Sequence, residues 1–318
     1  MTEAALVDAL AGRSVAVYGG TGLVGGALAA RLAELCAAGR GGPVYAVARR
    51  TPARPQPGVT YVRASVLDEQ EMAAGPRADL AVFVAGATSD YLDDPRSTVE
   101  VATLGFERFL RHTAGAARRV LVGSARLYGP QSDATPLREE DECRLRSPDP
   151  RNVYDGAKLI AEALARLAST SDRPVTMARL GNVYGPSVGR APATAFTAFV
   201  AAARTARRIV VSGPPGSLRN HVHARDVSDG LVRALLFGRP GEAYNIGSRD
   251  HLTNEDFARR IAQSIPYPVT VEIARPGAPA DHMVISIEKA IQELGFAPAL
   301  RIDEHLPLAV RWELEHNS

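Results

Sequence analysis

The chain has 318 residues, of which 46% are hydrophobic and 23% charged, a composition typical of globular proteins. Its 37 basic and 35 acidic residues give a net charge of +2 without a basic stripe, which argues against a nucleic-acid-binding surface. The sequence has no run of eighteen apolar residues, so we expect no membrane span. It has only two cysteines and an N-terminus unlike a secretory signal peptide, so we expect a cytoplasmic protein.

Short β-branched runs alternate with helical patterns over the first 180 residues. Strands are predicted at 14–19, 44–48, 59–62, 80–85, 119–124 and 174–180. Stretches with helical periodicity include 22–36, 97–114 and 153–170. This alternation predicts an α/β fold with a doubly wound parallel sheet and helices on both faces. Helix 153–170 is apolar nearly all round, so we expect a second partner besides the sheet, and another subunit is one candidate.

The second half of the chain differs in composition, with Gly- and Pro-rich loops between shorter predicted elements. The last of these elements is a helix at about 303–315. We predict that residues 1–180, with about 222–247, form the main Rossmann-type domain. Residues 181–221 and 248–318 are then expected to form a smaller α/β lobe that binds the substrate.

A glycine-rich segment, GGTGLVGG, follows the first predicted strand directly and leads into a helix. Glycines spaced three apart let the backbone turn tightly and approach a pyrophosphate, which the following helix N-terminus favours electrostatically. A plain glycine-rich turn is the alternative, but the flanking strand and helix favour a dinucleotide site. The expected contacts are Gly19, Thr21, Gly22, Leu23, Val24 and Gly25.

The second predicted strand ends in Arg49 and Arg50, where an acid would accept hydrogen bonds from the ribose of NAD. Guanidinium groups would instead bind the 2′-phosphate of NADP through charge-assisted hydrogen bonds. A solvated strand end is the simpler interpretation of two surface arginines. We favour NADP over NAD as the cofactor and assign it to this pair.

Tyr154 and Lys158 lie four residues apart in a predicted helix, and therefore on one face. A free phenol has a pKa of about 10, and a nearby ammonium group lowers it. Such a tyrosine exchanges a proton with a carbonyl or alcohol oxygen while hydride moves at the adjacent carbon. Ser124 ends the fifth predicted strand, at the sheet edge where doubly wound folds bind ligands, and its hydroxyl could hydrogen-bond the same carbonyl.

Taken together, these motifs resemble the extended short-chain dehydrogenase/reductase family of NDP-sugar epimerases, dehydratases and reductases. The likeness runs nearly end to end, through G-x-x-G-x-x-G at 19–25, S-x-x-x-Y-G at 124–129, Y-x-x-x-K at 154–158, RLGNVYGP at 179–186, RNHVHARDV at 219–227 and AYNIGS at 243–248. It implies a catalytic triad of Ser124, Tyr154 and Lys158, with Lys158 also contacting the nicotinamide ribose.

The same resemblance implies further contacts. Ser65 and Val66 are expected to flank the adenine, although an Asp is usual where Ser65 stands, and Ala85 is expected to border the cofactor cleft. The residues expected to bind the nucleotide-sugar substrate are Thr88, Ser124, Asn182, Arg219 and Arg275. Helices 97–114 and 153–170 match the pair that forms the family's dimer contact, so we expect a homodimer.

The chemistry we predict is NADPH-dependent reduction of a keto group, at C4, of a nucleotide-activated deoxysugar. Family dehydratases carry an Asp-Glu pair where this chain has Ala125 and Arg126, which argues against elimination of water. The alternative is an NDP-sugar epimerase that uses the same triad with retained NAD. A non-catalytic NADP sensor is a third hypothesis, which the intact triad disfavours.

Three other patterns point to different chemistry, and we give each of them little weight. The G-x-S-x-G match around Ser187 lies in a Pro-rich loop without a helix directly after it, so it does not predict a hydrolase. His221 and His223 lack an obvious third ligand, and we expect no metal site. His282 and Cys143 are interpreted as structural residues.

Overall fold

The computed structural model describes residues 2–52, 54–86, 94–144, 152–187 and 194–316. Its strands are β1 Val15–Tyr18, β2 Val44–Ala48, β3 Val59–Arg63, β4 Leu80–Phe83, β5 Arg118–Ser124, β6 Val175–Leu180, β7 Asn182–Tyr184, β8 Arg208–Val211, β9 Leu218–His223, β10 Ala243–Ile246, β11 His251–Thr253 and β12 Thr270–Ile273. Its helices are α1 Glu3–Leu10, α2 Leu23–Ala38, α3 Glu69–Ala73, α4 Pro95–Glu100, the π-helical turn η1 Val101–Gly105, α5 Phe106–His112, the 3₁₀ turn η2 Ala125–Tyr128, α6 Val153–Ala168, α7 Ala195–Ala206, α8 Ala224–Phe237, α9 Asn254–Gln263, α10 Glu288–Leu294 and α11 Ile302–His316.

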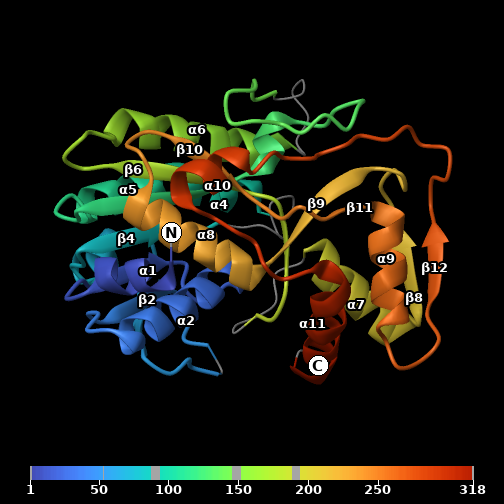
Figure 1. Cartoon of the computed structure of the whole chain (residues 1–318), viewed down its shortest axis with the longest axis horizontal. Helices are drawn as coiled ribbons and strands as arrows, with labels where there is room; N and C mark the ends of the chain where they lie inside the picture. Colours follow the sequence, from blue (N-terminus) through green and yellow to red (C-terminus); the bar gives the residue numbers. More distant parts are fainter. Residues whose placement is uncertain (1, 53, 87–93, 145–151, 188–193, 317–318) are drawn as a thin grey trace.

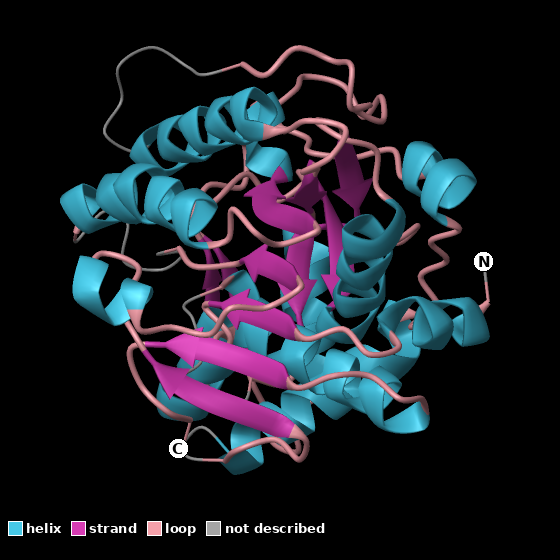
Figure 2. Ribbon diagram, turned by 90° about the vertical axis from the view of Figure 1, so that its left-hand side faces the viewer, coloured by secondary structure: helices cyan, strands magenta, loops and turns pink. Residues whose placement is uncertain are grey.

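The main sheet has seven strands in the order β10-β6-β5-β4-β1-β2-β3, and every pair in it is parallel. Figure 2 shows these strands in the middle of the molecule with helices on both sides. The expected doubly wound parallel sheet is therefore confirmed. Its order reverses between β1 and β4, and ligands of such folds bind at the carboxyl ends of the strands near this switch point.

Alternate residues of each main-sheet strand face opposite layers, as the period of two requires. In β1, Val15 and Val17 pack into a core under α1, α2, α8 and α10, whereas Ala16 and Tyr18 pack into a second core under α3, α5 and α6. Both faces of the sheet are thus covered, which is why its strands read as continuous apolar runs rather than as alternating ones.

A smaller lobe lies beside the main sheet and contains β7, β9 and β11 in one sheet and β8 and β12 in another (Figure 1). Its core contains Tyr184, Phe196, Ile209, Phe257 and Leu306 and lies between α7, α9 and α11. The chain returns from this lobe through α8 to β10, which pairs with β6 at the edge of the main sheet.

The helix predicted at 97–114 is interrupted in the structure. The segment consists of α4, a π-helical turn and α5, with Gly105 at the end of the turn. A Cβ at Gly105 would lie 2.8 Å from Cγ2 of Val66, so glycine permits this turn to approach the loop after β3 closely. Apolar periodicity could not reveal a contact between segments so far apart in sequence.

Helix α6 packs with one face against β5 and β6, and it also contacts α4, the η1 turn and α5. On its other face the side chains of Ile160 and Leu167 are 50% and 84% exposed, and Leu104 of the neighbouring η1 turn is 53% exposed. The segment from α4 to α5 is therefore a covering partner for α6 besides the sheet, and these exposed apolar side chains leave a further surface on α6.

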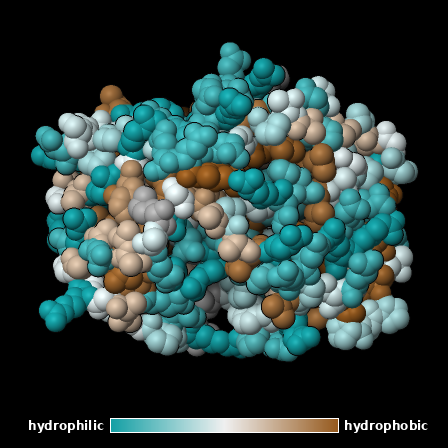
Figure 3. Space-filling view, viewed as in Figure 1, coloured by the Kyte–Doolittle hydropathy of each residue, from teal (hydrophilic) through white to brown (hydrophobic). Residues whose placement is uncertain are grey.

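Most of the molecular face in Figure 3 is hydrophilic, with separate groups of hydrophobic residues among the polar ones. Among the described residues, no helix combines the length and the apolar character needed to cross a lipid bilayer.

A buried ion pair links α6 to β6. Nη2 of Arg179 lies 2.5 Å from Oε1 of Glu162, its Nε donates to Oε2 at 3.1 Å, and both side chains are only 4% exposed. Nη1 of Arg179 donates to the hydroxyl of Tyr128, which in turn donates to Oδ1 of Asn245 in β10. This network holds the middle of α6 against the carboxyl ends of the sheet strands.

We expect Glu162→Gln to lower the free energy of unfolding by about 3 kcal/mol, because a buried guanidinium would lose its counter-charge. Urea unfolding followed by circular dichroism measures the effect. Glu107→Gln is the matched control, since Glu107 pairs with Arg111 on the solvent-exposed side of α5 and its loss should cost less than about 1 kcal/mol. Equal losses in the two variants would contradict a special role for the buried pair.

Candidate active site

The glycine-rich segment forms a tight turn between β1 and α2. Gly19 has φ of 91°, a conformation that favours glycine, and Gly22 caps the N-terminus of α2. A Cβ at Gly25 would lie 2.1 Å from the carbonyl oxygen of Gly19, so any side chain there would push the helix away from the turn. The helix N-terminus carries no acid in its first turn. These residues therefore suit a pyrophosphate approaching the backbone N–H groups of the turn.

The neighbouring strands bring other predicted cofactor residues to the same edge of the sheet. The N–H of Gly19 donates to the carbonyl of Val47 in β2, and a Cβ on Gly19 would lie 2.7 Å from the backbone nitrogen of Ala85, just after β4. Ser65 and Val66 follow β3. Ser65 donates its backbone N–H to the carboxylate of Glu71, and the side chain of Val66 is buried.

Arg49 and Arg50 come directly after β2, and both are exposed. Within the described part of the chain, neither forms an ion pair. Because β2 pairs with β1 up to Tyr18 and Val47, the two arginines lie at the edge that carries the glycine-rich turn. Two guanidinium groups at this position are available to an anion at the end of β2.

Ser124 lies at the carboxyl end of β5, at the same edge of the sheet, and is buried. Its Oγ accepts a hydrogen bond of 3.2 Å from the backbone N–H of Arg126, and the hydroxyl proton remains for donation to a ligand. Tyr154 lies in the first turn of α6 and is also buried, and α6 contacts the η2 turn that follows Ser124.

Lys158 is buried one turn after Tyr154. Its Nζ donates to the carbonyl oxygen of Val122 at 2.9 Å and lies 5.9 Å from the centre of the Tyr154 ring. A Cβ on Gly86 would lie 3.5 Å from the same Nζ, so the ammonium group faces the end of β4 as well. Burial lowers the pKa of Lys158 from 10.5 to about 8. Its contact with a nicotinamide ribose stays a prediction.

A second charged pair next to the triad was not foreseen. Arg126 donates to both carboxylate oxygens of Asp155, at 2.8 and 3.2 Å, and its guanidinium carbon lies 5.5 Å from the centre of the Tyr154 ring. The pair ties the turn after Ser124 to the first turn of α6. In sequence, the only indication was an arginine two residues after the serine and an acid directly after the tyrosine.

The predicted substrate residues lie in different surroundings. Asn182 is half-buried at the start of β7, beside His221 of β9. Arg219 is bonded to Asp281, with 2.6 Å between Nη2 and Oδ1, and Arg275 is exposed and donates to the carbonyl of Ser212. No interaction in the described part of the chain links the two arginines to each other. Thr88 lies outside the described residues.

His221 and His223 have structural surroundings. The ring of His221 stacks on Phe257 with 3.9 Å between centres, and Nδ1 of His223 caps the N-terminus of α8. Burial lowers their pKa values to about 3 and about 4 respectively. No group of three metal-ligating side chains occurs within the described ranges. Nδ1 of His282 accepts a backbone hydrogen bond, and Cys143 is a half-buried free thiol.

The G-x-S-x-G match covers residues 185–189, of which 188 and 189 lie outside the described residues. The described part of the match follows the short strand β7. Ser187 itself is buried. That this match does not mark a hydrolase stays a prediction.

A doubly wound parallel sheet, a glycine-rich turn after its first strand and a Ser, Tyr and Lys at the carboxyl edge define an extended short-chain dehydrogenase/reductase. Residues 15–247 match the NAD dependent epimerase/dehydratase family, and the chain belongs to this family.

Several characterised proteins are similar to the chain. It is 28% identical over 305 residues to the dTDP-6-deoxy-L-talose 4-dehydrogenase (NAD(P)(+)) of Kitasatospora kifunensis, covering 91% of this chain and 92% of that protein. It is 26% identical to the dTDP-glucose 4,6-dehydratase of Streptomyces antibioticus, covering 80% of this chain and 76% of that protein. The match to the human dTDP-D-glucose 4,6-dehydratase is 28% identical over 155 residues and spans only 42% of that protein and 48% of this chain.

Solved structures share the fold. Epimerase Mth375 from Methanothermobacter thermautotrophicus superposes with a TM-score of 0.86 at 23% identity and covers 98% of this chain and 95% of its own. DesIV, a dTDP-glucose 4,6-dehydratase from Streptomyces venezuelae with NAD and TYD bound, superposes with a TM-score of 0.81 at 24% identity and covers 96% of this chain and 98% of its own. At these identities the likeness shows the fold alone.

Proposed function

We propose that the protein reduces the C4 keto group of a nucleotide-activated deoxysugar. The glycine-rich turn, Arg49 and Arg50 would hold NADPH, which would supply the hydride. The reaction breaks the carbonyl π bond and forms one C–H and one O–H bond, so the products are an alcohol and NADP⁺. The substrate's diphosphate and base would be held by the lobe residues Asn182, Arg219 and Arg275.

Three residues of the chain have separate roles in the transfer of the proton. The Ser124 hydroxyl donates a hydrogen bond to the carbonyl oxygen and polarises it. Tyr154 gives its phenolic proton to that oxygen as negative charge develops there. The charge of Lys158, one helical turn away, stabilises the phenolate that remains. Solvent returns the proton to Tyr154 after the product leaves.

The arginine pair after β2 is the main reason for proposing a reductase and not an epimerase. A reductase consumes its cofactor and must exchange it in every turnover, and a clamp for the 2′-phosphate suits NADPH. Neither Arg49 nor Arg50 has a counter-charge within the described chain. The Kitasatospora relative is similar over nearly the whole chain, and its name, which gives dehydrogenation at position 4 and NAD(P)(+), supports the same interpretation.

The position after the catalytic serine speaks against dehydration. Elimination of water needs a carboxylic acid and a carboxylate near the sugar, and this chain has Ala125 and Arg126 there. The carboxylate next to Tyr154, that of Asp155, is bonded at both oxygens by Arg126. Because both oxygens of this carboxylate are engaged by Arg126, we favour carbonyl reduction over dehydration.

We expect the double variant Arg49→Ser/Arg50→Ser to lose about 10- to 100-fold in kcat/KM for NADPH, because hydrogen bonds to a charged phosphate contribute about 1.5–3 kcal/mol. The value for NADH should change little. Arg40→Ser, which removes an exposed arginine before β2, is the matched control. Cofactor oxidation followed at 340 nm with an NDP-4-keto-6-deoxysugar measures both. An unchanged NADPH/NADH ratio would contradict the clamp.

The cofactor that co-purifies with the enzyme separates the two leading functions. Loose binding with a preference for NADPH is expected of the reductase. NAD that stays bound through gel filtration would instead favour the epimerase, in which the same serine, tyrosine and lysine oxidise and re-reduce one carbon.

We further propose that the enzyme is a homodimer of the cytoplasm. The exposed Ile160 and Leu167 of α6 and Leu104 of the η1 turn form an apolar surface that suits a second copy. Cys36 and Cys143 are free thiols, as suits a reducing compartment. Sedimentation of Ile160→Glu/Leu167→Glu as a monomer would support this contact.

A further inference from the structure

A pocket opens at the amino-terminal edge of the main sheet, away from the triad. It has a volume of about 590 Å³ and lies between α5, the start of β5 and the loop from α6 to β6. Such a volume suits a small-molecule ligand. Arg119 in this pocket and Ser124 in the active site belong to the same strand, five residues apart, which separates them by about 16 Å. The pocket is therefore distinct from the site described above.

Arg119 lines this pocket and is only 4% exposed. Its Nη2 donates to the backbone carbonyl of Arg173, but its Nε is buried without a hydrogen-bond partner in the described chain. No carboxylate there forms an ion pair with it either. A buried guanidinium without a counter-charge is costly, and a bound anion would remove that cost. Burial and the nearby charge of Arg173 lower the pKa of Arg119, as expected for a cation without an acid.

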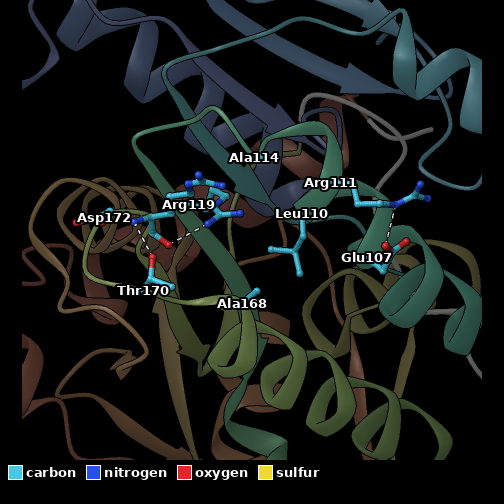
Figure 4. Close-up of a pocket in the computed structure, with 9 residues that line it drawn as sticks. Glu107, Leu110, Arg111, Ala114, Arg119, Ala168, Thr170 and Asp172 are labelled. Carbon is cyan, nitrogen blue, oxygen red and sulfur yellow. Dashed lines mark hydrogen bonds and ion pairs between the residues drawn. The ribbon is translucent and has the colours of Figure 1, made fainter.

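The two ends of the pocket differ in charge (Figure 4). At one end Arg111 lies beside Glu107, 2.8 Å apart, so these charges offset each other. At the other end Arg119 lies with Thr170 and Asp172. Thr170 accepts the backbone N–H of Arg173, which leaves its own hydroxyl proton to donate. Asp172 is exposed and screened by solvent, so the buried guanidinium dominates this end.

The middle of the pocket is apolar. Figure 4 shows the side chains of Leu110 and Ala168 between the two ends, and Ala114 also lines the wall. A ligand that fits would place an oxyanion at Arg119 and a short apolar or ring portion over Leu110. Two guanidinium groups and a hydroxyl offer more donors than the two oxygens of a carboxylate use, which favours a phosphoryl group.

We propose that this pocket binds a phosphomonoester or inorganic phosphate, with its oxygens at Arg119, Arg173 and Thr170. This assignment is independent of the reaction proposed above. The site takes a ligand of its own, separate from the nucleotide cofactor and the sugar substrate.

Calorimetric titration tests the site. The enzyme is first saturated with whichever of NADPH and NADH it binds more tightly, so that the cofactor turn is filled, and is then titrated with inorganic phosphate and with phenyl phosphate at constant ionic strength. Arg119→Met removes the guanidinium and keeps an apolar side chain. Arg118→Met is the matched control, because Arg118 is the adjacent strand residue and donates to Leu235 on the α8 side instead. We expect Arg119→Met to weaken binding about tenfold or more and Arg118→Met to leave it unchanged.

Other outcomes are informative as well. Tighter binding of phenyl phosphate than of phosphate would support contact with the apolar wall, and benzoate binding as well as phenyl phosphate would overturn the phosphoryl assignment. Equal affinities in wild type, Arg119→Met and Arg118→Met, or no binding to the wild type, would overturn the site. If Arg119→Met does not fold, Arg173→Met replaces it, because Arg173 is exposed and its loss should weaken binding in the same direction.

Discussion

Tyr154→Phe is expected to lower kcat about 10²- to 10⁴-fold, the usual contribution of a positioned general acid. The ring is retained, so the packing of α6 against the η2 turn is preserved and only the phenolic hydroxyl, the proposed proton donor, is lost. Oxidation of the reduced cofactor in the presence of an NDP-4-keto-6-deoxysugar measures turnover, and cofactor fluorescence measures binding. Binding should change little while turnover falls.

Tyr267→Phe is the control for this variant, because Tyr267 lies in the smaller lobe against Arg207 and should tolerate loss of its hydroxyl. A Tyr154→Phe enzyme with turnover near that of the wild type would remove Tyr154 from the mechanism. A variant that has lost cofactor binding as well would point to a structural role instead.

Lys158→Met should lower kcat/KM about 10²- to 10³-fold, comparable to the loss of one group that stabilises developing negative charge. The pH profile gives a second test. Since the pKa of Lys158 is lowered to about 8, the wild type should lose reductase activity as pH rises through that value and the ammonium group is lost. The variant should lack this step. Lys289→Met is the control, because Lys289 is the one other lysine of the chain and pairs with Glu242.

The stability of the fold should rise with pH where the activity falls, because the buried ammonium group of Lys158 destabilises the folded chain. Its pKa in the folded chain lies below the value of 10.5 for an unperturbed lysine, so the unfolded chain binds more protons between about pH 8 and 10.5 and stability rises over that range. The destabilisation is fully present below pH 8. Lys158→Met should therefore unfold at a higher temperature than the wild type at neutral pH, and an unchanged or lower melting temperature would contradict the buried charge.

Much of the main sheet could be predicted because its determinants are local. The six strands expected in the first 180 residues all occur, since each is a short β-branched run bounded by turn residues. The glycine-rich turn was also recognisable, because the packing of Gly25 against Gly19 requires glycine at fixed spacing. Ser124 and the Tyr154/Lys158 pair could be singled out from their positions at a predicted strand end and on a predicted helix face, and their catalytic roles stay predictions.

Sequence patterns could not predict interactions between segments that lie far apart in the chain. The bond from Lys158 to the carbonyl of Val122 depends on the distance between α6 and β5, and the π-helical turn depends on the approach of Gly105 to Val66. The pairing of Arg219 with Asp281 joins residues 62 positions apart. The sequence shows Arg119 only as one charged residue of a strand, because the pocket beside it is formed by segments that meet in the folded chain.

The attachments of α6 have a consequence for how the enzyme meets its ligands. This helix is fixed at its first turn by Asp155 and Arg126, one turn later by Lys158 and Val122, and further on by Glu162 and Arg179. The orientation of Tyr154, the proposed proton donor, is therefore already restricted when the chain folds. Little rotational entropy of Tyr154 then remains to be lost when a substrate binds, so in the proposed reaction the binding free energy can be directed to the reacting carbonyl.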